Sequence, residues 1–324
     1  MTILGRCLAM RLGVYSFDSL VLIPPSGLRA APPKEISMRK HYVLLLICLL
    51  LLPACSGDSQ ANSFLFEVND GEHVLYLLGS IHVAREDLYP LPEVMDQAFA
   101  ESEVLVVEVN MANAGETAFD LIWDLGQYPN GDGLSQNVRP ETLQRLQALG
   151  YEPAIYESMR PWLLVMTIQV MEFMKLGYNP ELGVDLHFTK RAAETGLAIE
   201  ELESVEQQLR MLADMSAEDE DAFLFYSLEQ MEHLAAIIDE MNGLWQAGDV
   251  DGLSELIFTR LYEPGYEQYY DQLLYTRNQD MAARIDEYLH SGRRAFVIVG
   301  AAHLLGDKGI LHILREAGYT VTQR

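Results

Sequence analysis

Three short apolar runs constrain the fold of this chain more than any other feature. They lie at residues 75–78, 104–109 and 295–299, and polar residues barely interrupt them. Strands that are buried on both faces have this composition, and such strands are typical of parallel sheets covered by helices. Residues 91–102 and 279–290 show helical periodicity ahead of the second and third runs. The alternation of strand and helix predicts an α/β fold with a mixed, largely parallel central sheet flanked by helices.

Further elements extend the predicted sheet. Residues 64–68 and 73–78 flank the turn sequence Asn69-Asp70-Gly71, which predicts an antiparallel hairpin at the start of the domain. Two more helix–strand pairs are predicted, with helices over 184–195 and 309–317 and strands over 198–202 and 319–322.

Two long stretches, residues 116–174 and 205–275, have helical composition and contain no convincing strand. We interpret them as a helical cap inserted on the α/β core over about 116–275 and interrupted by core elements near 184–204. Residues 63–324 would then form a single domain, which is a length that one large domain can reach.

The N-terminal part has the pattern of a bacterial lipoprotein. A charged start at residues 38–41 precedes a short apolar run, and Leu52-Pro53-Ala54-Cys55 resembles a lipobox. We expect a signal peptide over 38–54, a lipid anchor on Cys55 and a polar linker over 55–62. The alternatives are an ordinary secretory signal or an N-terminal membrane anchor. Residues 1–37 match neither a signal nor a core element, and we expect an over-extended, disordered start.

This N-terminus predicts a protein of the bacterial cell envelope, anchored by its lipid to the outer membrane and facing the periplasm. Ser56 after the lipidated cysteine favours the outer membrane. The other cysteines, Cys7 and Cys48, precede Cys55, so disulfides, cysteine nucleophiles and zinc–cysteine sites are excluded from the folded domain. A net charge of −26 makes nucleic acid a poor partner.

Two histidines follow apolar strands in the same way. Gly79-Ser80-Ile81-His82 and Gly300-Ala301-Ala302-His303 each begin where a predicted strand ends. A glycine there would let the backbone turn sharply, and the histidine would lie near the crevice where α/β folds bind ligands. If the two strands are neighbours, both imidazoles point toward one site. The alternative is that each histidine only stabilises a turn.

Carboxylates and an arginine are predicted at the same edge. Glu108 ends a buried strand, and together with His82 and His303 it forms a plausible ligand set for a catalytic divalent metal. Glu203 follows another strand and could be a further ligand or a general base. Arg277 and its neighbour Asn278 open a predicted helix, and Arg277 could stabilise an oxyanion or orient a carboxylate. A surface salt bridge or a helix cap is the alternative for each residue.

Several common catalytic motifs are absent from the sequence. There is no H-E-x-x-H zinc motif, no G-x-S-x-G elbow, no Walker loop and no G-x-G-x-x-G fingerprint. A serine hydrolase, an NTPase and a nucleotide-dependent redox enzyme are therefore disfavoured.

With these residues in place, the chain resembles the TraB/PrgY/GumN family, which includes the Tiki metalloproteases and is related to the erythromycin esterase and ChaN-like folds. The resemblance covers most of residues 64–323. Its most specific stretches are 77–83 (LLGSIHV), 89–92 (YPLP), 106–108 (VVE), 183–185 (GVD), 202–204 (LES), 277–278 (RN) and 299–304 (VGAAHL), with Gly306 and Gly309.

The resemblance implies an erythromycin esterase/ChaN-like α/β core and a metal-dependent hydrolase site. Manganese or cobalt would be the metal, with zinc as a further candidate. The positions that match the family's functional residues are His82, Glu108, Glu203, Arg277 and His303. Tiki relatives resemble proteases that trim secreted proteins, some bacterial relatives are named for limiting a peptide pheromone, and ChaN-like relatives bind haem. The reaction must therefore be argued from the site.

Three hypotheses follow for the function. In the first, the chain is an envelope peptidase in which His82, Glu108 and His303 hold the metal, Glu203 activates water and Arg277 steadies the oxyanion. In the second, it captures a peptide, haem or another iron compound without turnover. In the third, the histidines only stabilise turns and no metal binds.

Overall fold

The computed structural model describes residues 62–129, 131–260 and 270–324. Its strands form one six-stranded sheet in the order β4-β3-β5-β2-β1-β6. The strands are β1 (Leu65–Asn69), β2 (Val74–Ser80), β3 (Val104–Val107), β4 (Ala198–Glu201), β5 (Ala295–Gly300) and β6 (Thr320–Gln323). Strands β4, β3, β5 and β2 run parallel, whereas β1 pairs antiparallel with both β2 and β6. The mixed, largely parallel sheet is confirmed.

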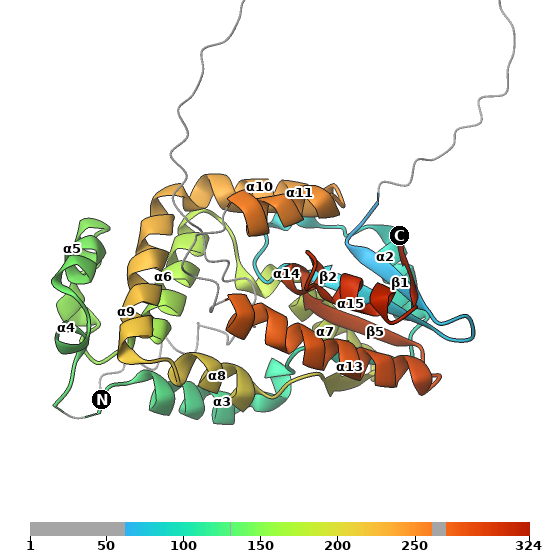
Figure 1. Cartoon of the computed structure of the whole chain (residues 1–324), viewed down its shortest axis with the longest axis horizontal. Coiled ribbons are helices and arrows are strands. Elements are labelled where there is room, and N and C mark those ends of the chain that lie inside the picture. Colours follow the sequence, from blue (N-terminus) through green and yellow to red (C-terminus); the bar gives the residue numbers. More distant parts are fainter. Residues whose placement is uncertain (1–61, 130, 261–269) are drawn as a thin grey trace, which may run out of the picture.

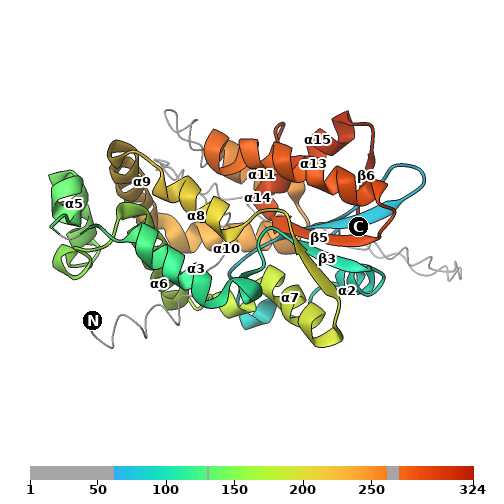
Figure 2. The same cartoon turned by 90° about the horizontal axis from the view of Figure 1, so that it is seen from below.

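Helices cover both faces of the sheet. Figure 2 shows α13 and α15 on one face and α2 and α7 on the other. The bounds of these helices are α2 (Glu93–Ala100), α7 (Val184–Thr195), α13 (Thr276–His290) and α15 (Ile310–Glu316). The short helix α14 (Ala301–Leu304) follows β5 directly. Because β3 and β5 lie between two helical layers, their side chains are buried throughout, as their composition predicts.

A further group of helices, the helical extension, reaches away from one end of the sheet (Figure 1). It comprises α3 (Met111–Gly126), α4 (Leu134–Asn137), α5 (Pro140–Ala148), α6 (Pro161–Lys175), α8 (Val205–Ala213) and α9 (Ala217–Gln230). Helices α10 (Leu234–Gln246) and α11 (Val250–Glu255) instead contribute Trp245 and Leu253 to the apolar cluster around the sheet. Short 3-10 segments lie at Glu86–Leu88, Pro153–Ile155, Pro180–Leu182 and Met231–His233, and π-helical turns at Leu256–Arg260 and Asp271–Tyr275. No strand interrupts the described parts of 111–175 and 205–290, which agrees with the predicted helical insertion.

The helical extension has an apolar core of its own. Trp162, Leu209 and Leu224 belong to a buried cluster that is separate from the cluster around the sheet. Helix α6 contributes more side chains to it than any other helix, which explains why α6 is apolar almost all round. The methionines Met166 and Met171 pack against this cluster, as expected of residues that fill gaps in a core.

Arg277 and Asn278 lie at the opening of α13, as predicted, because this helix starts at Thr276. The sequence did not reveal the π-helical turn at Asp271–Tyr275 that runs directly into α13. Arg277 and Asn278 are buried and belong to the site described below.

The lipoprotein pattern lies outside the described residues. This applies to residues 1–37, the signal peptide over 38–54, Cys55 and nearly all of the linker over 55–62. Among the residues that are described, no helix combines the length and the hydrophobicity needed to cross a bilayer.

A polar contact between Arg160 and Glu220 joins three helices of the helical extension. The guanidinium of Arg160 lies 2.9 Å from Oε1 of Glu220 and also donates hydrogen bonds to the carbonyls of Leu125 and Ala213, at 3.1 and 2.6 Å. Arg160 thereby links the carboxyl ends of α3 and α8 to the start of α9. Burial raises the pKa of Glu220 to about 7, and Arg160 offsets only part of this shift.

Stability should therefore fall as Glu220 ionises. The pKa of Glu220 in the folded protein is about 7, above the ordinary value of 4.5. The contribution of the protonated carboxyl to stability is therefore complete below pH 4.5 and is lost as the pH rises to about 7. We expect the free energy of unfolding to fall by on the order of 2 kcal/mol across this window. Glu220→Gln should flatten this dependence in urea denaturation at a series of pH values. Equal slopes for both proteins would show that Glu220 does not titrate there.

Candidate active site

The carboxyl ends of β2 and β5 bring the two histidine motifs together. The strands are parallel neighbours, and Ser80 lies opposite Gly300 in the register, while Gly79 lies opposite Val299. The two Gly-x-x-His segments therefore leave adjacent strands with an offset of one residue. This confirms that the two strand ends lie side by side. Ser80 is buried at the end of β2.

Gly79 serves a different purpose from the one predicted. It does not have a positive φ, and Gly300 has φ −55°, which any residue can adopt. A Cβ at position 79 would lie 2.8 Å from Cδ1 of Leu304 and 3.2 Å from Cα of Ala301. Glycine at position 79 lets α14 pack closely against β2, and the expected sharp turn is not its role.

The loop that carries His82 is held by the segment before α7. Ala84 and Asn179 exchange backbone hydrogen bonds, and the amide of Val184 donates to the carbonyl of Ile81 at 2.9 Å. The side chain of His82 is 3% exposed, and its Nδ1 lies 3.1 Å from Oδ1 of Asp185. The loop is thus fixed through its backbone, and the imidazole faces a carboxylate.

His303 is fixed by a chain of polar contacts. It is fully buried in α14, and its Nδ1 contacts Oδ1 of Asn278. The amide nitrogen of Asn278 donates to the carbonyl of Lys308 at 2.9 Å, which determines which end of the amide faces the ring. Because Oδ1 can only accept, Nδ1 of His303 carries the proton and Nε2 carries the lone pair.

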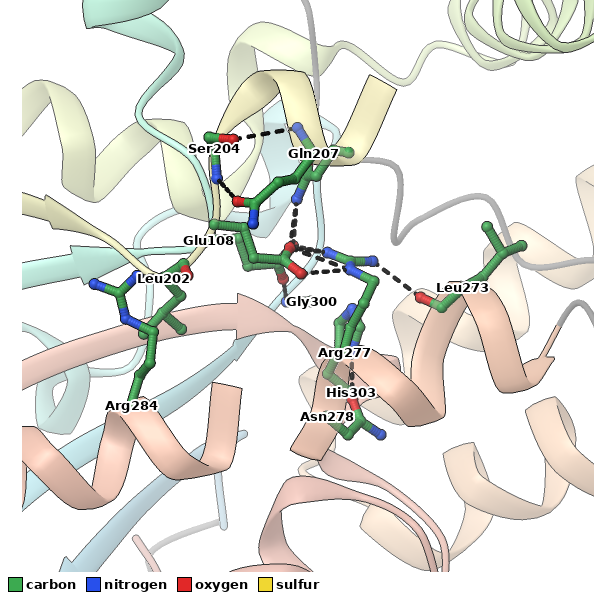
Figure 3. Close-up of polar contacts among 12 residues, drawn as sticks. Glu108, Leu202, Ser204, Gln207, Leu273, Arg277, Asn278, Arg284, Gly300 and His303 are labelled. Atoms are coloured by element: carbon green, nitrogen blue, oxygen red, sulfur yellow. Dashed lines mark hydrogen bonds and ion pairs between the residues drawn. The ribbon is translucent and has the colours of Figure 1, made fainter. Parts of the chain in front are cut away.

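A buried ion pair joins the two predicted carboxylates to the predicted arginine (Figure 3). Nε and Nη2 of Arg277 both donate to the carboxylate of Glu203, at 2.9 and 2.5 Å, which is a two-pronged contact. Nη2 also lies 3.3 Å from Oε2 of Glu108. Of the two roles predicted for Arg277, the structure shows the orientation of a carboxylate.

The backbone places Glu108 beside Glu203. Beyond the end of the β3–β4 ladder, the amide of Glu203 donates to the carbonyl of Glu108 at 2.8 Å. The other carboxylate oxygen of Glu108 accepts a hydrogen bond from the amide of Gly300. Ser204 and Gln207 form a capping box that starts α8 immediately after Glu203 (Figure 3). These hydrogen bonds hold the carboxyl ends of β3, β4 and β5 next to one another.

Gln208 is a site residue that the sequence did not reveal. Its side-chain amide donates to Oε2 of Glu203 at 3.0 Å and reaches Oε2 of Glu108 at 3.5 Å. It is buried on α8, so the helical extension contributes directly to the site. Asp185 belongs to the stretch 183–185 that supports the family resemblance, but the sequence predicted no role for it. No sequence signal distinguishes these two side chains from ordinary polar residues near the start of a helix.

The ionic cluster is buried. The carboxylates of Glu108 and Glu203 share the guanidinium of Arg277, and all three side chains are at most 12% exposed. Charged side chains are costly to bury unless they are paired and hydrogen-bonded, and these contacts provide such pairing.

The residues fit a divalent metal in their donor chemistry. His303 has the tautomer of a ligand, with its Nδ1 proton given to an oxygen and its lone pair on Nε2. Nδ1 of His82 lies 3.1 Å from Oδ1 of Asp185, but the two atoms do not have the geometry of a hydrogen bond. In the part of the chain that the structure describes, no three His, Cys, Asp or Glu side chains are gathered as a metal-binding group. Glu108 is held by Arg277 and Gly300 instead. The metal-ligand roles of these residues stay a prediction.

The fold and the site define a mixed α/β protein whose buried charged centre lies at the carboxyl edge of a parallel sheet. A sequence model of the TraB/PrgY/gumN family matches residues 64–323. The chain belongs to this family, as the sequence motifs predicted.

Several proteins resemble the chain. The protein YbaP of Escherichia coli (strain K12) is 26% identical over 249 residues, which cover 76% of this chain and 89% of YbaP. Metalloprotease TIKI1 of Xenopus tropicalis is 23% identical, with 82% of this chain and 62% of the relative covered. Metalloprotease TIKI2 of Danio rerio is 25% identical, with 82% and 61% covered. The chain thus spans less than two thirds of these two metalloproteases. No solved structure matches the chain.

Removal of Arg277 should destabilise the fold strongly. Arg277→Ala leaves two buried carboxylates without their cation, and breaking a buried pair in this way costs about 3–5 kcal/mol. Arg277→Lys keeps the charge but cannot make the two-pronged contact, so its loss should be smaller. The free energy of unfolding from urea denaturation measures both effects.

The matched control is Arg210→Ala. Arg210 pairs with Glu206 on the exposed face of α8, and exposed pairs contribute less than about 1 kcal/mol. Similar losses for Arg277→Ala and Arg210→Ala would contradict the central place given to the buried pair.

Proposed function

We propose that the protein is a metal-dependent hydrolase of peptide or amide bonds. One observation carries the proposal: buried acidic side chains and two histidines lie on neighbouring strand ends, and the nitrogen Nε2 of His303 is prepared as a ligand. Membership of a family that includes relatives named metalloproteases supports the same reaction class.

Each residue has a defined task in this proposal. His82 and His303 would hold the metal, with Glu108 as the carboxylate beside them. A divalent metal, manganese or cobalt or zinc, would supply Lewis acidity toward water and a carbonyl oxygen. Glu203 is the candidate base, and Arg277 and Gln208 hold its carboxylate in one orientation. Asn278 positions His303 and need not touch the substrate.

A second function is capture of a peptide or an iron compound without turnover. The two-pronged contact between Arg277 and Glu203 favours it, because an arginine-bound carboxylate is a poor proton acceptor. Glu203→Gln distinguishes the two functions, since it should abolish hydrolysis but leave capture intact.

We also propose the cell envelope as the location. The supporting observation is the lipobox-like sequence that ends at Cys55. Peptides or proteins of the periplasm would be the substrates, and the membrane would be contacted through the lipid. Mass spectrometry of the protein from membranes tests this, because a diacylglycerol on Cys55 adds a defined mass.

The proposed reaction is tested with the purified full-length chain. We expect the wild type to bind a stoichiometric divalent metal and to cleave members of a peptide library when manganese, cobalt or zinc is supplied. His82→Ala and His303→Ala should each lose metal and at least about 100-fold in turnover, since each removes a ligand. Metal content is measured by elemental analysis and cleavage by mass spectrometry.

The controls separate folding from chemistry. His290→Ala is the matched variant, because His290 is an exposed histidine at the end of α13, away from the strand ends that carry the site. It should behave as the wild type. Metal binding without cleavage would support capture, and absence of metal from the wild type would contradict the hydrolase.

A further inference from the structure

The helical extension encloses two polar side chains of α9 almost completely. Ser227 is 3% exposed and Gln230 is 4% exposed. Within the described residues, neither Oγ of Ser227 nor Oε1 and Nε2 of Gln230 has a hydrogen-bond partner. Burying a polar group without a hydrogen bond costs free energy. Such groups in a folded protein therefore need an explanation.

Other buried polar side chains on helices bond to their own backbone. The hydroxyl of Thr167 on α6 donates to the carbonyl four residues earlier at 2.7 Å, and the side-chain amide of Asn242 on α10 does so at 2.8 Å. Ser227 lies inside α9 and has the carbonyl of Phe223 at the same spacing, but its hydroxyl bonds to no atom of the described chain. The hydroxyl is thus left for a partner outside α9.

Both side chains point toward the sheet side of the helical extension. Cζ of Arg145 on α5 lies 5.3 Å from the ring centre of Phe225, so Phe225 marks the face of α9 that packs against α5. Gln230 and Ser227 lie roughly 140° and 160° around the helix from Phe225. Figures 1 and 2 show α5 on the side of α9 that is away from the sheet. Met231, which follows Gln230, packs against both apolar clusters, so the pair lies near the junction of the extension and the sheet.

The pair suits a neutral ligand that offers both a donor and an acceptor. A glutamine amide donates and accepts at once, and a serine hydroxyl can do either. Every peptide group except that of proline presents one N–H and one C=O. Anionic ligands are typically bound by arginine or lysine, and α9 contains acidic residues but no Lys or Arg. The chemistry therefore favours the main chain of a peptide over an anionic compound.

We propose that Ser227 and Gln230 form a subsite that binds the main chain of a peptide at the junction of the helical extension and the sheet. The inference rests on the proposed function, which takes peptides as substrates, but it assigns no step of the reaction to either side chain. Ligand sites are common where two structural units meet. The pair is no more enclosed than the candidate active site, where His82 is 3% and Glu108 is 4% exposed.

Stability without peptide is measured first, by urea denaturation of the full-length chain. Replacing a buried polar group that has no partner by an apolar one of similar size removes a cost. We therefore expect the urea midpoint of Gln230→Met to rise by about 0.3 M. Asn242→Leu is the matched control, because it removes a buried amide that does have a partner, and it should lower the midpoint. A lower midpoint for Gln230→Met would overturn the inference, since it would show a structural role.

Peptide binding is measured next, by fluorescence anisotropy with chelator present so that no metal-dependent turnover occurs. The probe is a fluorescein-labelled mixture of random-sequence octapeptides, compared with the same mixture N-methylated along its main chain. The wild type should prefer the unmethylated mixture. Gln230→Met and Ser227→Ala should each weaken its binding about 3- to 10-fold, which is the loss of one neutral hydrogen bond. Gln147→Met replaces an exposed glutamine of α5 and should bind as the wild type does.

The outcomes separate this inference from the proposed function. If both variants bind the unmethylated mixture as tightly as the wild type, the inference fails while the hydrolase is still decided by its cleavage assay. If the variants lose affinity but the wild type cleaves nothing, the inference stands and the hydrolase fails. A wild type that binds neither mixture also overturns the inference. Circular dichroism identifies a variant that does not fold, and Ser227→Ala, the smaller change, then carries the test.

Discussion

Two carboxylates at the ends of neighbouring strands share one guanidinium, and this contact joins elements that are far apart in the sequence. Glu108 comes from the end of β3, Glu203 from the end of β4 and Arg277 from α13. Gln208 adds the helical extension to the same cluster. A charge cluster of this kind is tolerated inside a protein only when each partner is held in place, so the relative positions of strands and helices are fixed around it.

The sheet could be predicted because burial dictates composition. The runs that became β3 and β5 are apolar on both sides, and the two glycine–histidine motifs mark where β2 and β5 end. Glu108 could be found because it interrupts an apolar run, and the histidines and Glu203 because each follows a predicted strand. Arg277 was found from its place at the start of a predicted helix. What could not be predicted was the partner of each residue. Register and helix packing decide that Arg277 binds Glu203 and that Asp185 faces His82.

The two histidines show that one sequence motif can have different surroundings in the fold. Both follow glycine by three residues, but Nδ1 of His303 is hydrogen-bonded to an amide oxygen of α13, whereas Nδ1 of His82 lies 3.1 Å from a carboxylate of α7 without hydrogen-bond geometry. The amide requires a second contact, to the carbonyl of Lys308, to fix its own direction.

The pairing of β1 has a practical consequence for work with this protein. Leu65 lies opposite Leu78, and the amide of Ser63 bonds to the carbonyl of Arg324 at 2.7 Å. Both ends of the described domain therefore lie at the edge of the sheet that carries the histidine loops. A tether, a purification tag or a solid support attached at either end would approach this edge. The turn at Gly71 lies at the opposite end of β2, and it is the better position for a fluorophore or an affinity handle.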